Sequence, residues 1–403
     1  MTVVESSDKL KLVHSDIRGP IYQRALEMER RGIEVLKLNT GNPGNFGFGM
    51  PESVRAALLE NLDRAVAYCG PGGLPEAREA LRAYHAGRGL EGVREEDIFI
   101  GNGVSEMAQM VCASVLSAGD ELLLPTPGYS LWSNGAYLAG GKPVFYVCDE
   151  KSDWYPDVED MARKITPRTK AILLINPNNP TGQVYAPALV EKVVALAREH
   201  DLLLIADEIY DRLIMDDMPF RSVAAMAPDM PVVTLNGLSK SHIVCGFRCG
   251  WAAVTGPRRL TEELRDCLMK LSALRLCGNV LSQLVLPAAM GDPDSTRAML
   301  VPGGRIYEQR AAALRALDRL DCLSYVKPHA SFYIFPRITD RTRVRDDRRF
   351  AMDLLEDRHI LLVPGSGFDW PEPDHFRLVL LPEPEKIYRA IMDIGGFLER
   401  YHQ

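Results

Sequence analysis

The sequence predicts an α/β protein with a mainly parallel central sheet. Between about residues 95 and 255, short apolar runs alternate with stretches of helical periodicity, which is typical of parallel strands covered by helices. The runs are ELLLPTP, KPVFYVC, AILLINP, LLLIADE, VVTLNGL and GWAAVTG, and the helical stretch PALVEKVVALAREH separates two of them. With 403 residues, 46% of them hydrophobic, the chain is long enough for a large core and two or three domains.

The pattern changes after about residue 296. A helical stretch, GGRIYEQRAAALRALDRL, leads into VKPHASFYIFPRI, a charged loop TDRTRVRDDRR, a helix, and the strands ILLVPG and FRLVLL. This mixture indicates a smaller α+β domain. We expect residues 1–45 to form an N-terminal arm that joins the small domain, residues 46–295 the large domain, and residues 296–403 the small C-terminal domain.

Composition excludes several classes of function. The net charge of -7 and the pI near 5.7 argue against nucleic acid or an anionic membrane as the main partner. No apolar run approaches the roughly 18 residues that a membrane helix needs, and we expect a cytoplasmic protein. The eight cysteines show no CxxC spacing and the eight histidines no ligand spacing. We therefore expect no metal site. Cys245 and Cys249 flank Arg248 and could lie near a bound cofactor, but we expect them, like the other thiols, to serve as packing.

Lys240, in the stretch LNGLSKSHIVCGFRCGW, is the strongest candidate for a chemical role. Polar residues that suit pyridoxal phosphate bound to a lysine amine follow other apolar runs. Asp207 and Tyr210 follow DLLLIA, and Asn179 follows AILLINP. Asp207 can keep a pyridine nitrogen protonated, so that the ring withdraws electrons from a carbanion. Asn179 and Tyr210 can donate hydrogen bonds to the phenolate oxygen of the ring and stabilise that anion.

The phosphate group has candidates of its own. Arg248 lies eight residues after the lysine, and its planar guanidinium can bind phosphate through two hydrogen bonds. Ser239 adds a hydroxyl. In DIFIGNGVSEMAQMVCASVL, a short strand, a glycine-rich turn and a helix follow one another. The free amides at the helix start, around Gly103, Val104 and Ser105, would form an anion seat.

Each of these signals also has a plainer explanation. A lysine after a serine is commonly a surface residue, NPNNPTG could be only a turn, and an aspartate at a strand end could be a helix cap. Their order along the chain, with each group at the end of an apolar strand, favours one shared site.

The motifs NPNNPTG, ADEIYD, LSK and GFRCGW occur in the order seen in the fold-type I pyridoxal-phosphate aminotransferases of class I and II, and the chain resembles that family nearly end to end. The segments SDIRGPIY, VLKLNTGNPGNFGF, CDEKSDWYPD and GFDWPEPDHFRLVLLP resemble the bacterial glutamate-pyruvate (alanine) aminotransferases. The resemblance implies a three-layer large domain and a smaller α+β domain. It also implies transfer of an amino group between an amino acid and a 2-oxo acid in two half-reactions, with the lysine as proton carrier.

The resemblance also assigns roles to residues. It implies Lys240 as the Schiff-base lysine, Asp207 as the partner of the pyridine nitrogen, and Asn179 with Tyr210 as the phenolate donors. Tyr129 would stack on the ring. The implied phosphate ligands are Gly103, Val104, Ser105, Ser239 and Arg248.

Further implied roles concern the substrate and a second subunit. Arg377 would bind the substrate α-carboxylate, assisted by Gly41 and Asn179. Tyr68, in YCGPGGLPEAR, would reach the cofactor phosphate of a neighbouring subunit, so a homodimer with shared sites is expected. Arg18 could bind a distal carboxylate such as that of glutamate, or it could form a surface salt bridge.

Three departures from the family pattern make the substrate uncertain. Gly128 stands where an aspartate is expected, Ser241-His242-Ile243 replaces a Thr-Tyr-Arg stretch, and Ala330 replaces a glycine. Two alternatives therefore remain open at this point: an aminotransferase of specialised metabolism with another amino donor, and a C–S lyase on the same scaffold. A transcription regulator would need an added DNA-binding domain, and only some forty residues precede LNTGNP.

Overall fold

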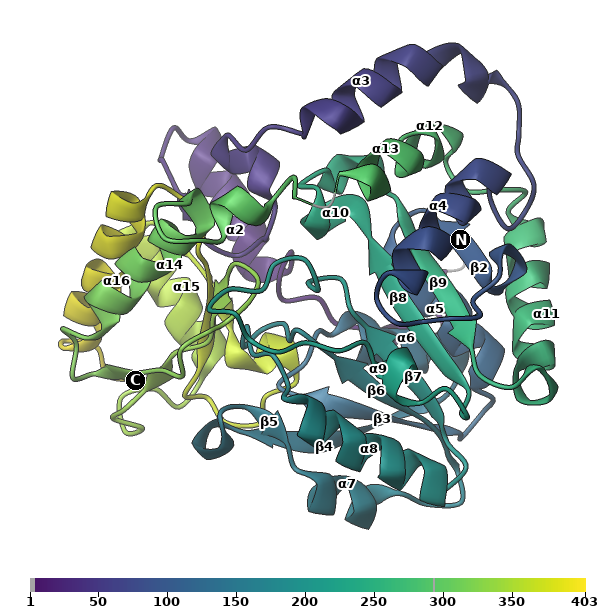
Figure 1. The fold of residues 1–403 in the computed structure, drawn as a ribbon. Helices are drawn as coiled ribbons and strands as arrows, with labels where there is room; N and C mark the ends of the chain where they lie inside the picture. The colour runs from purple at the N-terminus through teal and green to yellow at the C-terminus, as the bar shows by residue number, and fades with distance from the viewer. Residues whose placement is uncertain (1–3, 293) are drawn as a thin grey trace.

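A central eight-stranded sheet organises the computed structural model, which describes residues 4–292 and 294–403 (Figure 1). The strand order is β2-β9-β8-β7-β6-β3-β4-β5, and the neighbours from β8 through β4 are parallel to one another. The two sheet margins are antiparallel, so the predicted mainly parallel sheet is confirmed. The strands are β2 (Ile98–Gly101), β3 (Glu121–Thr126), β4 (Lys142–Asp149), β5 (Tyr155–Pro156), β6 (Thr169–Ile175), β7 (Leu203–Asp207), β8 (Val232–Gly237) and β9 (Gly250–Thr255).

Helices cover both faces of this sheet and make three layers. Successive residues of a strand point to opposite faces, so Leu173 and Ile205 pack into one hydrophobic cluster while Ile172 and Leu204 pack into another. The first cluster is closed by α5 (Val104–Val115), α6 (Leu131–Ala139) and α11 (Arg258–Leu274). The second is closed by α3 (Glu52–Asn61), α4 (Pro75–Ala86), α7 (Val158–Lys164), α8 (Pro187–Glu199), α9 (Val223–Met226) and α13 (Leu286–Gly291).

A second core joins the two ends of the chain. Helix α2, drawn in purple, lies beside the green and yellow C-terminal helices (Figure 1). Strand β1 pairs in parallel with β13, with Leu36 opposite Ile360. We keep residues 1–45, 46–295 and 296–403 as proposed units, supported by this packing. The elements are α2 (Pro20–Arg30), β1 (Leu36–Lys37), α14 (Arg305–Leu317), β10 (Leu323–Ser324), β11 (Tyr333–Ile334), β12 (Arg337–Ile338), α15 (Asp347–Arg358), β13 (Ile360–Leu361), β14 (Val363–Pro364), β15 (Phe376–Val379) and α16 (Pro384–Leu398).

One boundary differs from the expected loop TDRTRVRDDRR. Its last three residues are already helical, because α15 begins at Asp347. Asp346 caps the helix, and its side chain accepts hydrogen bonds from the backbone N–H groups of Arg348 and Arg349, both at 3.0 Å. Across the described part of the chain, no helix combines the length and apolar character required to cross a bilayer.

His14 connects the segment between α1 (Asp8–Leu12) and α2 to Asn134 and Asp369. Its Nε2 lies 3.1 Å from Asp369 Oδ1, its Nδ1 lies 3.5 Å from Asp16 Oδ2, and its backbone N–H donates to Asn134 Oδ1 at 3.0 Å. Hydrogen bonding to Asp16 and then to Asp369 raises the pKa of His14 to about 9, against the effect of burial. At neutral pH the imidazole is therefore a cation held between two carboxylates.

We predict that this segment loosens as the pH rises. The pKa of His14 is about 6.5 unfolded and about 9 folded, so its stabilising effect is complete below about 6.5 and is lost as pH rises through 9. Limited tryptic cleavage at Lys11 and Arg18 should be faster at pH 9.5 than at pH 7 in the native protein, and fast at both in His14→Gln. The exposed His200→Gln is the control; native cleavage that does not change between these pH values would contradict the prediction.

Candidate active site

A cavity of about 550 Å³ opens at the carboxyl ends of β6 and β7. Ligands bind at this edge in open α/β sheets, because the strand ends and the following loops converge there. Most of the sequence-predicted site residues line it. They are Arg18, Gly41, Val104, Ser105, Tyr129, Asn179, Asp207, Tyr210, Ser239, Lys240 and Arg248.

Lys240 lies on α10 (Leu238–Ser241), the single helical turn that follows β8. Its Nζ donates a hydrogen bond to the carbonyl oxygen of Gly41 and lies 3.8 Å from Cys245 Sγ. Cys245 in turn donates to Ser239 O at 2.9 Å. The expectation that Cys245 serves only as packing is therefore wrong, because the loop after α10 turns its thiol back into the cavity beside the lysine amine.

Asp207 is the last residue of β7 and is buried. Trp132 Nε1 donates to its Oδ2 at 3.0 Å, and the backbone N–H of Ile209 donates to its Oδ1 at 3.3 Å. Burial raises the pKa of Asp207 to about 6. Among the described residues no cation pairs with this carboxylate, so a protonated pyridine nitrogen would supply the missing charge.

Tyr210 contacts a residue that the sequence reasoning missed. Its hydroxyl lies 2.9 Å from the hydroxyl of Tyr333, and burial raises the pKa of Tyr210 well above the usual value. Tyr333 also explains Gly41, because a Cβ on Gly41 would overlap the Tyr333 ring and hydroxyl. A side chain at residue 41 would therefore have to displace the Tyr333 hydroxyl from beside Tyr210.

The predicted anion seat lies where α5 begins. Gly103 precedes the helix with a φ of +91°, and a Cβ there would collide with the guanidinium of Arg248. Arg248 donates to Ser239 Oγ at 3.5 Å, Cys245 O at 3.1 Å and Asn102 O at 3.3 Å, which are all uncharged oxygens. Within residues 4–292 and 294–403 it has no carboxylate partner. A free guanidinium beside helix-start amides fits a phosphate group.

Arg377 differs from the other predicted residues because it lies behind the cavity wall. It is 1% exposed and packs between the rings of Tyr333 and Phe368, at 4.4 and 4.6 Å. Its Nη1 donates to Asn179 Oδ1 at 2.9 Å, its Nη2 donates to Asn39 O, and its Nε has no partner. Burial lowers the pKa of Arg377. A buried guanidinium that is held only by neutral oxygens and aromatic faces is suited to a carboxylate ligand.

The three departures from the family pattern do not line the cavity. The backbone N–H of Gly128 donates to Phe368 O at 2.9 Å, and a Cβ there would overlap Pro125 O. His242 is fully buried against Ala289 O, and Ala330 is fully buried where its N–H donates to Gly182 O. Each of the three therefore contacts protein backbone.

The structure bears on the two expectations for Arg18 and on the position of Tyr68. Arg18 lines the cavity and makes no ion pair with any described residue, so the surface salt bridge considered for it is not present. Tyr68 lies between η2 (Leu62–Val66) and α4, is 78% exposed, and is not part of the cavity lining of its own chain.

Trp132 and Tyr333 were missed for a common reason. Both lie in apolar strings, PTPGYSLW and HASFYIF, that indicate core packing. A signal was available, since a buried indole or phenol needs a hydrogen-bond partner, and PTPGYSLW also contains the predicted site residue Tyr129.

At or behind one cavity, the described residues place a lysine amine, a buried carboxylate without a cation, a guanidinium beside helix-start amides and a buried arginine without an anion. This is the class of site that fits pyridoxal phosphate and a substrate with a carboxylate. The family comparison agrees. The chain belongs to the aminotransferase class I and II family, whose model matches residues 33–394, and enzymes of this family depend on pyridoxal phosphate.

Named relatives cover nearly all of the chain. The glutamate-pyruvate aminotransferase AlaA of Escherichia coli K12 is 44% identical over 100% of both chains. The alanine aminotransferase of Mycobacterium bovis is 43% identical over 98% of this chain and 93% of its own. Among solved structures, an Escherichia coli aminotransferase superposes with a TM-score of 0.98 at 44% identity, covering 100% of both chains. The alanine aminotransferase of Pyrococcus furiosus superposes with 0.93 at 33% identity, over 98% of this chain and 100% of its own.

We predict that Arg377→Ala lowers kcat/KM for every amino-acid substrate by about 100-fold, because hydrogen bonds to a charged group contribute about 1.5–3 kcal/mol. Arg377→Lys keeps the charge but loses the planar two-pronged geometry, so it should recover only part of the loss. Steady-state kinetics with a panel of amino acids tests this. A loss confined to glutamate would instead assign Arg377 to a distal carboxylate.

Proposed function

We propose that this chain transfers the amino group between alanine or glutamate and the matching 2-oxo acids, pyruvate and 2-oxoglutarate. The observation that carries the proposal is Lys240 Nζ in a cavity with the buried Asp207 carboxylate and the unpaired Arg248 guanidinium. The relatives at 42–44% identity over nearly the full length are named as glutamate-pyruvate or alanine aminotransferases, so the lyase and specialised-metabolite alternatives are not favoured.

The cofactor residues have separable tasks. Pyridoxal phosphate, when bound, supplies an electron-withdrawing ring that stabilises the negative charge left when an amino acid loses its Cα proton. Asp207 holds a proton on the pyridine nitrogen, and Tyr210 with Asn179 donates toward the phenolate oxygen. Arg248 and Ser239, together with the α5 start (Gly103, Val104 and Ser105), anchor the phosphate, while Tyr129 covers the ring.

The substrate residues orient the bond that breaks. Arg377 binds the α-carboxylate with Asn179 and Gly41, and this fixes the direction of the Cα–H bond relative to Lys240. Lys240 Nζ then removes the Cα proton and returns a proton in the next step. The Gly41 carbonyl and Cys245 Sγ hold the amine for this task. Arg18, free of ion pairs within the described residues, binds the distal carboxylate when the substrate is glutamate.

We further propose a homodimer in which Tyr68 reaches the cofactor phosphate of the neighbouring subunit. Support comes from the 78% exposure of Tyr68 and from the exposed apolar side chains Val66, Leu274 and Leu276, which are 91%, 83% and 55% exposed. If these side chains form one patch, they would suit a surface that a partner covers. The cytoplasmic location expected from the sequence stays a prediction.

The proposed function predicts that a single half-reaction can be observed. Purified protein loaded with pyridoxal phosphate should convert alanine to pyruvate in about one equivalent per site without any oxo acid, and added 2-oxoglutarate should restart turnover. Lys240→Ala should lose nearly all of this, while the exposed Lys270→Ala should keep it. Ammonia or thiol release without an oxo-acid requirement would point to the lyase, and substantial transfer by Lys240→Ala would refute the site.

The proposed dimer predicts that each active site is formed by residues of both subunits. Tyr68→Phe and Lys240→Ala subunits, each weakly active alone, should form mixed dimers in which one of the two sites has both native residues. Activity should therefore recover to about a quarter of the native level for a random mixture in which half the dimers are mixed. Verified mixed dimers that stay inactive would show that Tyr68 serves its own chain.

A further inference from the structure

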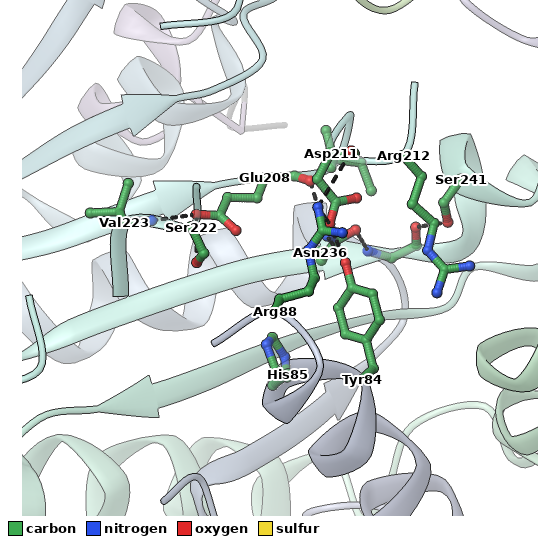
Figure 2. A network of polar contacts seen from close by, with 12 residues as sticks. Tyr84, His85, Arg88, Glu208, Asp211, Arg212, Ser222, Val223, Asn236 and Ser241 are labelled. Atoms are coloured by element: carbon green, nitrogen blue, oxygen red, sulfur yellow. Dashed lines mark hydrogen bonds and ion pairs between the residues drawn. The ribbon is translucent and has the colours of Figure 1, made fainter. Parts of the chain in front are cut away.

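A buried polar network lies behind Lys240, and the roles proposed above do not use it. Figure 2 shows Tyr84, Arg88 and Asp211 gathered near Asn236. Asn236 is 2% exposed and lies in β8, four residues before Lys240. Neither Asn236 nor the other three line the active-site cavity, so any effect on the chemistry must pass through a neighbouring residue.

The side-chain amide of Asn236 joins the ends of two strands. The ladder between β7 and β8 includes the N–H of Glu208, which donates to Leu235 O at 2.9 Å. One step further, Asn236 Nδ2 donates to Glu208 O at 3.0 Å, while Asn236 Oδ1 accepts from the N–H of Gly237 at 2.7 Å. The amide therefore connects the residue after Asp207 with the residue that opens the Lys240 turn.

The network allows this amide one orientation. Asn236 Nδ2 also donates to Tyr84 OH at 3.2 Å, and Tyr84 OH donates to Asp211 Oδ2. The Asp211 side chain is fully buried and pairs with Arg88 at 2.8 Å. Rotating the amide by half a turn would set its oxygen against the Glu208 carbonyl oxygen and its nitrogen against the Gly237 N–H, both unfavourable contacts in a buried site.

The carbonyl group of Gly237 is held by Ser241, which in turn contacts His242. The carbonyl oxygen of Gly237 accepts a hydrogen bond from Ser241 Oγ at 3.0 Å. Ser241 Oγ also lies 2.8 Å from His242 Nδ1. His242 Nε2 lies 2.8 Å from Ala289 O. Ser241 and His242 are two of the positions at which a departure from the family pattern was expected, and their side chains help to fix the turn that carries Lys240.

We propose that Asn236 is a positioning residue that sets Lys240 Nζ relative to Asp207, with Tyr84 holding its amide in place. The inference rests on the proposed roles of Lys240 and Asp207. A misplacement of about 1 Å in a reacting group can lower a rate about 100-fold, so a small rotation of the α10 turn has a large kinetic effect. Arg377 does not touch this network, so binding of the carboxylate is left intact, whereas Ser239 lies on the same turn and moves with Lys240.

The test compares Asn236→Ala, Tyr84→Phe and Ser222→Ala. Ser222 is the matched control, because its buried hydroxyl donates to Glu208 Oε1 at 3.0 Å in the same network without touching Gly237. Asn236→Ala should lower kcat by about 10- to 100-fold with KM for alanine within about 2-fold of native. In the cofactor-free protein, the Gly237 amide should exchange hydrogen faster than in the native chain.

The two other variants should lower kcat less than Asn236→Ala does. Tyr84→Phe keeps the ring but removes the hydroxyl, so it should give a smaller loss of kcat, again with near-native KM. Ser222→Ala should lower Tm and leave both kcat and Gly237 exchange at native values. If Asn236→Ala does not fold, Tyr84→Phe decides, and a native kcat in that variant overturns the proposal.

Lys240→Ala, measured alongside, separates two kinds of failure. Activity in Lys240→Ala would refute the proposed function itself. An inactive Lys240→Ala beside an Asn236→Ala variant with native kcat, native Gly237 exchange and only a lower Tm would refute the positioning role alone.

Discussion

The hydrogen-bonded ladder of β6, β7 and β8 is the constraint on which the site depends. Ile175 pairs with Asp207 and Asp207 pairs with Leu235, so three parallel strands end side by side. The loops after these strands carry Asn179, Tyr210 and Lys240. Because both faces of the sheet are buried, a shift of one residue in register would turn each strand's side chains to the opposite face. The same apolar packing that stabilises the sheet therefore sets the relative positions of the polar groups.

Several charged side chains of the site lack a partner of opposite charge. Asp207 has no cation, and Arg248 and Arg377 have no carboxylate within the described residues. Asp207 and Arg377 are buried, so leaving their charges uncompensated lowers stability by amounts that core packing must offset, whereas Arg248 is exposed. In the proposed function, each missing partner corresponds to a charge on a bound molecule: a ring N–H, a phosphate and a carboxylate. The site is complementary to its ligands in charge before they arrive.

The sequence was informative wherever local pattern determines structure. Apolar runs located the strands, and the residues that follow them located Asp207 and Lys240. It was silent on contacts between distant segments: Trp132 reaches Asp207 across 75 positions and Tyr333 reaches Tyr210 across 123. Periodicity carries no information about such pairs. The interpretation of Cys245 as a packing residue was wrong, because the apolar pattern of a segment does not show the direction in which a loop turns.

The pairing of Leu36–Lys37 with Ile360–Leu361 bears on how the protein is made. A chain grows from its N-terminus on the ribosome, so β1 and the Gly41 segment behind it must wait for a partner strand that is translated more than three hundred residues later. Until then the central sheet can form with its cofactor edge uncovered. During synthesis, the catalytic cavity can therefore close only after nearly the whole chain has been translated.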